Sequence, residues 1–294
     1  MAEGVTKNCI RSRSRSLEQI DHKILRHSRV VEETLDELLS LGRPLRVLEV
    51  GFGRGRALVE LAWTFRASDV EFFGVDLERT RPVTQSEDLR LVAREFDIIP
   101  AGELEGFRVP SLDFYDAQDL RFEDETFDLV YTAVTMRFMP RKADFLREVC
   151  RVLRPGGRAL LHVGESGWRY PQGPVSGDAT VTPYRSRLVL VHGGELIPLP
   201  AYLELVGGTR FRLRCARTGR CTILVEKLAP GRLEMDLVKD EKLSCPMEAL
   251  PFTESDGQPD DGYRSVYRIS DREHAAMLER GLIERISERP AEAG

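Results

Sequence analysis

A run of alternating glycines between an apolar strand and a helix constrains the fold of this chain most. The run reads Leu45-Arg-Val-Leu-Glu-Val-Gly-Phe-Gly-Arg-Gly55, and Glu71-Phe-Phe-Gly-Val-Asp76 follows about twenty residues later. Glycines let backbone N–H groups and the positive end of the next helix approach a ligand, because a Cβ would hold the ligand away. An acid that ends the second strand can accept hydrogen bonds from ribose hydroxyls in the same crevice. The pattern therefore predicts a nucleotide-type cofactor site.

The spacing of the glycines indicates which cofactor this is. A dinucleotide fingerprint, Gly-x-Gly-x-x-Gly, requires glycine where Arg56 stands, and the third glycine comes one step early at Gly55. The run that begins at Glu49, Glu-Val-Gly-Phe-Gly-Arg-Gly, instead resembles the acid-x-Gly-x-Gly-x-Gly signature of class I S-adenosylmethionine-dependent methyltransferases.

Two later segments carry the same resemblance. Leu112–Val130 resembles the third strand of that family, its Asp-Ala pair and its Phe-x-Asp-x-x-Phe-Asp-x-Val lead into the fourth strand. Phe145–Leu161 resembles the helix, Leu-x-Pro-Gly-Gly turn and fifth strand. The four motifs follow in the family's order and cover roughly residues 40–165, a little under half of the chain.

The resemblance implies the fold, the cofactor and the residues that bind it. The expected fold is α/β, a doubly wound and mostly parallel sheet with a reversed final strand, plus an N-terminal helix and a C-terminal extension. Glu49 would lie near the amino acid end of S-adenosylmethionine, Asp76 on its ribose, and Asp116 at the adenine amino group. The full expected cofactor set is Glu49, Gly51, Gly53, Gly55, Asp76, Leu77, Asp116, Ala117 and Ala133.

The catalytic residues are less well marked. Methyl transfer from a sulfonium depends mainly on alignment, and a base is needed only if the acceptor arrives protonated. Glu165 follows the fifth strand at a place where a base reaches an acceptor. Arg137 stands where ubiquinone- and menaquinone-type methyltransferases have arginine, although the asparagine that follows there is Phe138 here. A surface or helix-capping Arg137, and a core role for His162, are open alternatives.

The chain divides into three parts on composition and pattern. Residues 1–16 read as a flexible arm, 17–229 as the methyltransferase domain, and 230–294 as an acidic extension. Within the domain, residues 166–200 are rich in Gly, Pro and aromatic residues and are expected to form the acceptor-side wall or lid. Trp168, Tyr170 and Tyr184 would wall an aromatic acceptor or pack that loop. The expected elements are a helix over 17–41, strands over 45–50, 70–76, 111–115, 127–133 and 158–163, helices over 55–66, 86–96 and 141–153, a hairpin over 188–197, a helix over 200–206, and an antiparallel pair over 211–217 and 221–227.

Composition and charge limit the kinds of partner that we expect for this chain. The net charge is −5, and residues 230–294 hold fifteen acids against nine bases, so no basic face for nucleic acid is expected. No apolar run approaches the roughly 20 residues of a membrane span, and the N-terminus lacks an apolar signal core, which predicts a cytoplasmic protein. Five scattered cysteines without a Cys-x-x-Cys pair predict neither disulfides nor a metal site.

The sequence predicts methyl transfer from S-adenosylmethionine to a small-molecule acceptor. A protein or peptide methyltransferase that docks its substrate on residues 166–200 is one alternative, and a cofactor-binding protein without turnover is another. The Asn/Asp-Pro-Pro-aromatic signature of amino methylation of nucleic acid is absent from the chain. The acceptor, the methylated atom and the oligomeric state are left open.

Overall fold

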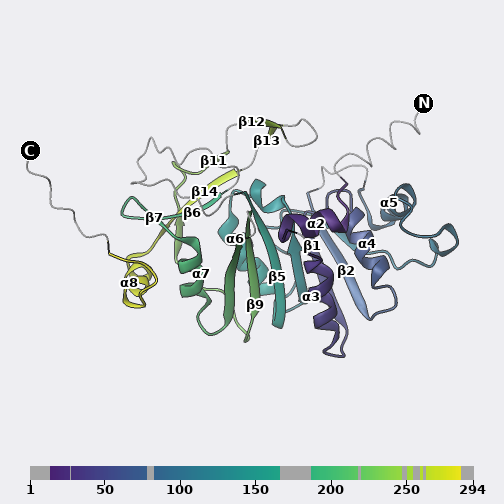
Figure 1. Cartoon of the computed structure of the whole chain (residues 1–294), viewed down its shortest axis with the longest axis horizontal. Coiled ribbons are helices and arrows are strands. Elements are labelled where there is room, and N and C mark those ends of the chain that lie inside the picture. The colour runs from purple at the N-terminus through teal and green to yellow at the C-terminus, as the bar shows by residue number, and fades with distance from the viewer. Residues whose placement is uncertain are drawn as a thin grey trace, which may run out of the picture.

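A seven-stranded sheet forms the centre of the molecule (Figure 1). The computed structural model describes residues 14–26, 28–77, 83–165, 187–217, 220–246, 250–253, 259–260 and 263–285. The strand order is β3-β2-β1-β4-β5-β9-β8, in which β1 to β5 are parallel and β9 runs antiparallel to both β5 and β8. This arrangement confirms the predicted doubly wound sheet with a reversed strand near its end.

The elements follow the predicted alternation along the chain. The helices are α2 (Leu17–Ile24), α3 (Val30–Leu39), α4 (Arg56–Thr64), α5 (Leu89–Glu95), α6 (Lys142–Val152), α7 (Leu199–Gly207) and α8 (Asp271–Glu279), with single turns η1 (Ser86–Asp88), η2 (Ala101–Glu103) and η3 (Thr135–Phe138). The strands are β1 (Leu45–Val50), β2 (Val70–Asp76), β3 (Ser111–Phe114), β4 (Phe127–Thr132), β5 (Leu153–Glu165), β6 (Arg187–His192), β7 (Glu195–Ile197), β8 (Phe211–Arg217), β9 (Arg220–Lys227), β10 (Leu237–Lys239), β11 (Cys245–Pro246), β12 (Leu250–Thr253), β13 (Pro259–Asp260) and β14 (Tyr263–Ile269).

Helices cover both faces of the central sheet because its strands are apolar on both sides. In β4, Leu129 and Tyr131 join the core under α2, α3, α4 and α5, whereas Val130 joins the core under α6 and α7. All six residues of β4 are buried. Apolar cores therefore pack against both faces of the sheet at its centre. This packing holds the ends of the central strands in place.

Two predicted elements differ from the structure. The expected single helix over 17–41 is two helices, because Leu25 is extended and the buried Asp21 carboxylate accepts the Val31 N–H at 2.9 Å. That N–H lies in the first turn of α3, where helical amides lack a partner within the helix. The fifth strand begins at Leu153 rather than 158, with a shift of register that includes Gly156 at φ +81°.

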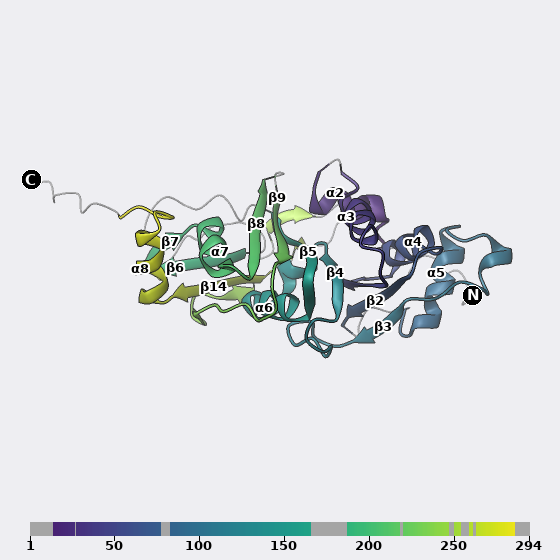
Figure 2. The same ribbon diagram turned by 90° about the horizontal axis from the view of Figure 1, so that it is seen from below.

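The tail joins the hairpin after residue 186 in a second sheet of order β10-β14-β6-β7, with β11 also paired to β14. The hairpin predicted over 188–197 is present, with its turn at Gly193-Gly194, and a capping box at Ser270 opens α8. Figure 2 shows this sheet and α8 beyond the β8 end of the molecule, opposite α5. In the described part of the chain, no helix is long and apolar enough to cross a bilayer.

Candidate functional site

The predicted cofactor residues gather at the carboxyl edge of the central sheet. β1, β2, β3 and β4 are parallel neighbours, so the segments that follow them meet at one edge. The glycine turn follows β1, Asp76 ends β2, Asp116 follows β3 and Ala133 follows β4. The structure therefore brings together residues spread over more than eighty positions of sequence.

All three glycines of the turn have left-handed backbones, with φ of +77° at Gly51, +59° at Gly53 and +74° at Gly55. Gly55 is the N-cap of α4, so the turn leads directly into a helix N-terminus. A Cβ on Gly51 would lie 1.8 Å from Thr135 Oγ1, which shows how closely η3 approaches this turn. Glycine is required here by both conformation and space.

Asp76 fixes the glycine turn to β2. Its Oδ2 accepts the Gly53 N–H at 2.7 Å, and its Oδ1 accepts the N–H of the exposed Leu77 at 2.7 Å. An ionised carboxylate offers about four acceptor positions. Asp76 thus shapes the turn, and its acceptor capacity also suits ribose hydroxyls.

Glu49 forms a buried pair with Tyr131 on the neighbouring strand. The Tyr131 hydroxyl donates to Glu49 Oε2 at 3.0 Å, and both side chains are almost fully buried. Burial raises the pKa of Glu49 to about 8, against the lowering effect of the Tyr131 hydrogen bond, while the charge of Asp76 raises it further. A cation placed beside this carboxyl would favour its ionised form.

The remaining predicted cofactor residues differ in exposure. Asp116 is half exposed and accepts from the Gln118 backbone at 2.9 Å and from its side-chain amide at 3.0 Å. Ala117 and Ala133 are buried.

The predicted catalytic residue Arg137 lies on η3, the turn that follows β4. Arg137 is buried, not on the surface, and its guanidinium lies 4.7 Å from the centre of the Phe138 ring. Val134, just before η3, has φ +70°, which is rare for a β-branched residue. His162 on β5 is buried, and its Nδ1 accepts the Val134 N–H at 3.0 Å.

Other predicted acceptor-side residues cannot be placed in this way. Glu165 ends β5, opposite Arg220, but its side chain lies outside the described part of the structure. Most of the predicted lid, residues 166–186, with Trp168, Tyr170 and Tyr184, also lies outside it. In the ranges that are described, no group of His, Cys, Asp and Glu is arranged to hold a metal ion.

Sequence reasoning missed three residues of this region: Tyr131, Val134 and Lys142. A tyrosine needs a hydrogen-bond partner when it is buried, so Tyr131 in the buried strand β4 carried a signal. Its partner depends on the pairing of β1 with β4, in which Glu49 lies opposite Tyr131. The positive φ of Val134 and the burial of Lys142 have no local sequence signal.

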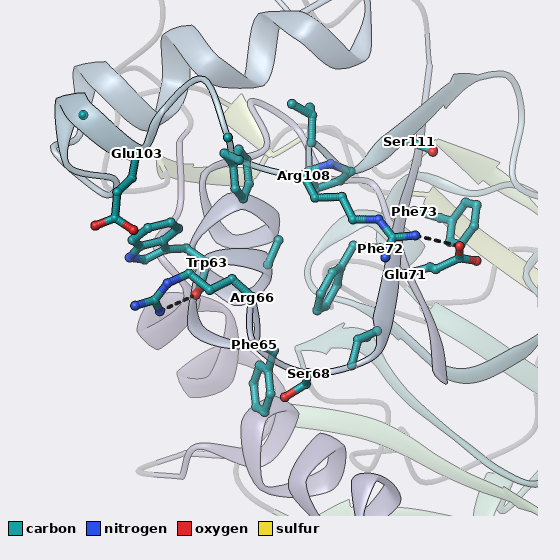
Figure 3. Close-up of a pocket in the computed structure, with 17 residues that line it drawn as sticks. Trp63, Phe65, Arg66, Ser68, Glu71, Phe72, Phe73, Glu103, Arg108 and Ser111 are labelled. Carbon is teal, nitrogen blue, oxygen red and sulfur yellow. Dashed lines mark hydrogen bonds and ion pairs between the residues drawn. The ribbon is translucent and has the colours of Figure 1, made fainter. Parts of the chain in front are cut away.

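A cavity of about 390 Å³ lies away from this edge, at the amino end of β2. Figure 3 shows Trp63, Phe72 and Arg108 among the residues that line it. Arg108 pairs with Glu71 at 2.7 Å, and the Arg66 guanidinium lies 4.0 Å from the centre of the Trp63 ring. None of the predicted site residues lines the cavity, so it is separate from the glycine turn.

Comparisons with known proteins find similarity in the part of the chain that contains the glycine turn, Asp76 and Asp116. Residues 48–161 match the family model described as "Methyltransferase domain". The chain is 38% identical over 115 residues to a fatty-acid O-methyltransferase of Mycolicibacterium smegmatis, which covers 39% of this chain and 35% of that protein. It is 28% identical over 129 residues to a 27-O-demethylrifamycin SV methyltransferase of Amycolatopsis mediterranei, covering 44% and 42%. Each match thus spans less than half of the curated relative.

A solved S-adenosylmethionine-dependent methyltransferase from Methanosarcina mazei is 19% identical, with a TM-score of 0.39, over 68% of this chain and 98% of that one.

Proposed function

We propose that this protein transfers a methyl group from S-adenosylmethionine to a small-molecule acceptor. The premise is that residues 48–161 match a methyltransferase domain and begin with the glycine signature of class I S-adenosylmethionine-dependent enzymes. The observation that carries the proposal is the meeting of the glycine turn, Asp76 and Glu49 at one sheet edge. The relatives with this domain are named as methyltransferases of small molecules.

The residues at the edge fit this cofactor. The Cβ-free glycine turn and the N-terminus of α4 suit its carboxylate, Asp76 suits its ribose, and the buried Glu49 carboxyl suits its positive charge. When bound, S-adenosylmethionine supplies a methyl group that its sulfonium has already activated. The work left to the chain is to hold the acceptor in line and to exclude water.

We assign the acceptor an oxygen nucleophile. The names of two relatives include O-methylation, and the buried Arg137 guanidinium beyond β4 suits an oxygen that carries negative charge. An acceptor that arrives ionised needs no base. For a neutral hydroxyl, Glu165 at the end of β5 is the proposed base.

The test is to incubate the full chain with methyl-labelled S-adenosylmethionine and a fractionated small-molecule extract of the host. We expect label in an apolar fraction, and much less label with the Asp76→Ala variant. Label recovered in protein would support the alternative of a protein or peptide methyltransferase. Cofactor binding without any label transfer would support a binding protein without turnover.

A further inference from the structure

A buried lysine joins η3 to the C-terminal strand β14. Lys142, the first residue of α6, is fully buried. Its Nζ donates to the carbonyl oxygens of Met139 and Tyr263, each at 2.6 Å, and to that of Arg137 at 3.4 Å. Arg137 and Met139 belong to η3 and its C-cap, whereas Tyr263 begins β14. One amino group thus bridges two segments that are far apart in sequence.

Packing alone does not explain a lysine at this place. In the part of the chain that the structure describes, Lys142 has carbonyl partners and no carboxylate within ion-pair distance. Burial of an ammonium group is costly, and an apolar residue of similar size is often equally good or better for stability. The bonds of Lys142 therefore point to a requirement for a fixed geometry of the three carbonyls.

Two further hydrogen bonds connect β14 to residues 140–143, the segment between η3 and the first turn of α6. Ser265 Oγ donates to the Pro140 carbonyl at 2.6 Å, and the Tyr267 hydroxyl accepts the Ala143 N–H at 3.3 Å. Ser265 and Tyr267 are buried. On its other side, η3 approaches the glycine turn, where Thr135 Oγ1 donates to the Gly51 carbonyl at 3.4 Å. The η3 turn is therefore held between the glycine turn on one side and β14 on the other.

We propose that β14 forms the acceptor-side wall of the site and that Lys142 is the positioning residue that fixes η3 against this wall. The inference rests on the proposed function, since it takes η3 as the place where the acceptor meets the cofactor. β14 lies outside residues 48–161, the part shared with the methyltransferase family model. Acceptor choice would then reside in a segment outside the part of the chain that matches the family model.

The chain offers a matched control in Lys227, the other lysine with a fully buried side chain in the described residues. Its Nζ donates to the Cys150 carbonyl at 3.2 Å and pairs with Glu125 at 3.2 Å. It ends β9, which is antiparallel to β5, so it lies at the amino edge of the parallel strands, away from η3. Replacing Lys227 therefore measures the effect of losing a buried lysine at a place that does not contact the proposed wall.

The experiment compares the full-length variants Lys142→Met and Lys227→Met by hydrogen exchange and by titration with S-adenosylmethionine. We expect Lys142→Met to speed exchange in peptides that cover 135–141 and 263–267 by at least about tenfold, because three carbonyls lose their shared donor. The dissociation constant of S-adenosylmethionine should stay within about threefold of the parent value, because the glycine turn is intact. Lys227→Met should leave both peptides unchanged.

Turnover gives the second readout once an acceptor is identified. Lys142→Met should raise the acceptor KM by about tenfold or more with a smaller change in kcat, and Lys142→Arg should restore part of the loss because it keeps the donors. Equal exchange in the two methionine variants, or loss of cofactor binding in Lys142→Met, would overturn the role of Lys142. A parent protein that binds cofactor and methylates nothing would overturn the proposed function, and the exchange comparison would still decide the role of Lys142.

Discussion

Each oxygen of the Asp76 carboxylate accepts one backbone N–H, from Gly53 or from Leu77. Asp76→Ala should weaken S-adenosylmethionine binding ten- to hundredfold, or about 1.5–3 kcal/mol, through loss of a charge-assisted hydrogen bond to the ribose. Isothermal titration measures this directly.

Two further variants serve as comparisons for Asp76→Ala. Asp76→Asn keeps one acceptor oxygen and should lose less affinity than Asp76→Ala. Asp36→Ala removes an exposed aspartate of α3 and should change nothing. Unchanged affinity in Asp76→Ala would remove Asp76 from the site.

The buried Glu49 predicts that cofactor affinity depends on pH. Burial raises the pKa of Glu49 from 4.5 to about 8, so the carboxyl is mostly protonated at pH 7 without cofactor. A cationic ligand binds the ionised form better, so affinity should rise by up to about tenfold per pH unit below pH 8 and level off above it. Titrations at several pH values, in buffers of different ionisation enthalpy, would also detect the proton released.

Two variants check that Glu49 is the group responsible. Glu49→Gln should abolish the pH dependence. Tyr131→Phe removes a hydrogen bond that lowers the pKa of Glu49, so the profile should move to higher pH. In the cofactor-free protein, the stabilising contribution of Glu49 is complete below pH 4.5 and is lost as the pH rises through about 8. A flat profile in the parent protein would contradict this account.

At the scale of single elements, the glycine turn allows a direct comparison. Gly51 and Gly156 both have left-handed backbones, at φ +77° and +81°, but a Cβ would meet Thr135 at Gly51 and nothing within 4 Å at Gly156. Gly156→Ala should cost only the backbone strain, about 1–2 kcal/mol. Gly51→Ala should cost more and should also weaken cofactor binding.

Chemical denaturation of the two variants measures this difference. Equal losses of stability would show that the approach of η3 to the turn can relax without cost.

The succession of strands and helices was predictable from sequence because apolar periodicity, glycines and prolines act locally. The break between α2 and α3 was not, since it depends on Asp21 reaching the Val31 N–H across ten positions. The positive φ of Val134 also escaped prediction, because it is imposed by neighbours such as His162. Local rules thus placed the glycine turn and Asp76 correctly on the fold, but not the groups that hold them.

At the scale of the whole molecule, the tail is part of the fold. β14 pairs with β6 across more than seventy residues of sequence, and its Val266 and Tyr267 are buried. A short strand can pair with many others, so its partner depends on the tertiary structure. Composition alone predicted only an acidic extension.

A chain that ends at residue 229 should therefore be far less stable than the full chain. It loses several buried apolar side chains of β14 and α8, each worth about 1.5–3 kcal/mol, and its melting temperature should fall by more than about 10 °C. A chain that ends at residue 285 keeps both elements and is the control. Circular dichroism melting distinguishes the two, and equal melting temperatures would show that the second sheet is dispensable.

Titration of the full chain with S-adenosylmethionine, beside a parallel titration with NAD⁺, tests most directly that the carboxyl edge of the central sheet is a methyl-donor site. We predict saturable binding of S-adenosylmethionine with one site per chain, weakened by Asp76→Ala, and no saturable binding of NAD⁺. Saturable binding of NAD⁺ in place of S-adenosylmethionine, or binding of S-adenosylmethionine that Asp76→Ala and Gly51→Ala leave unchanged, would contradict the account.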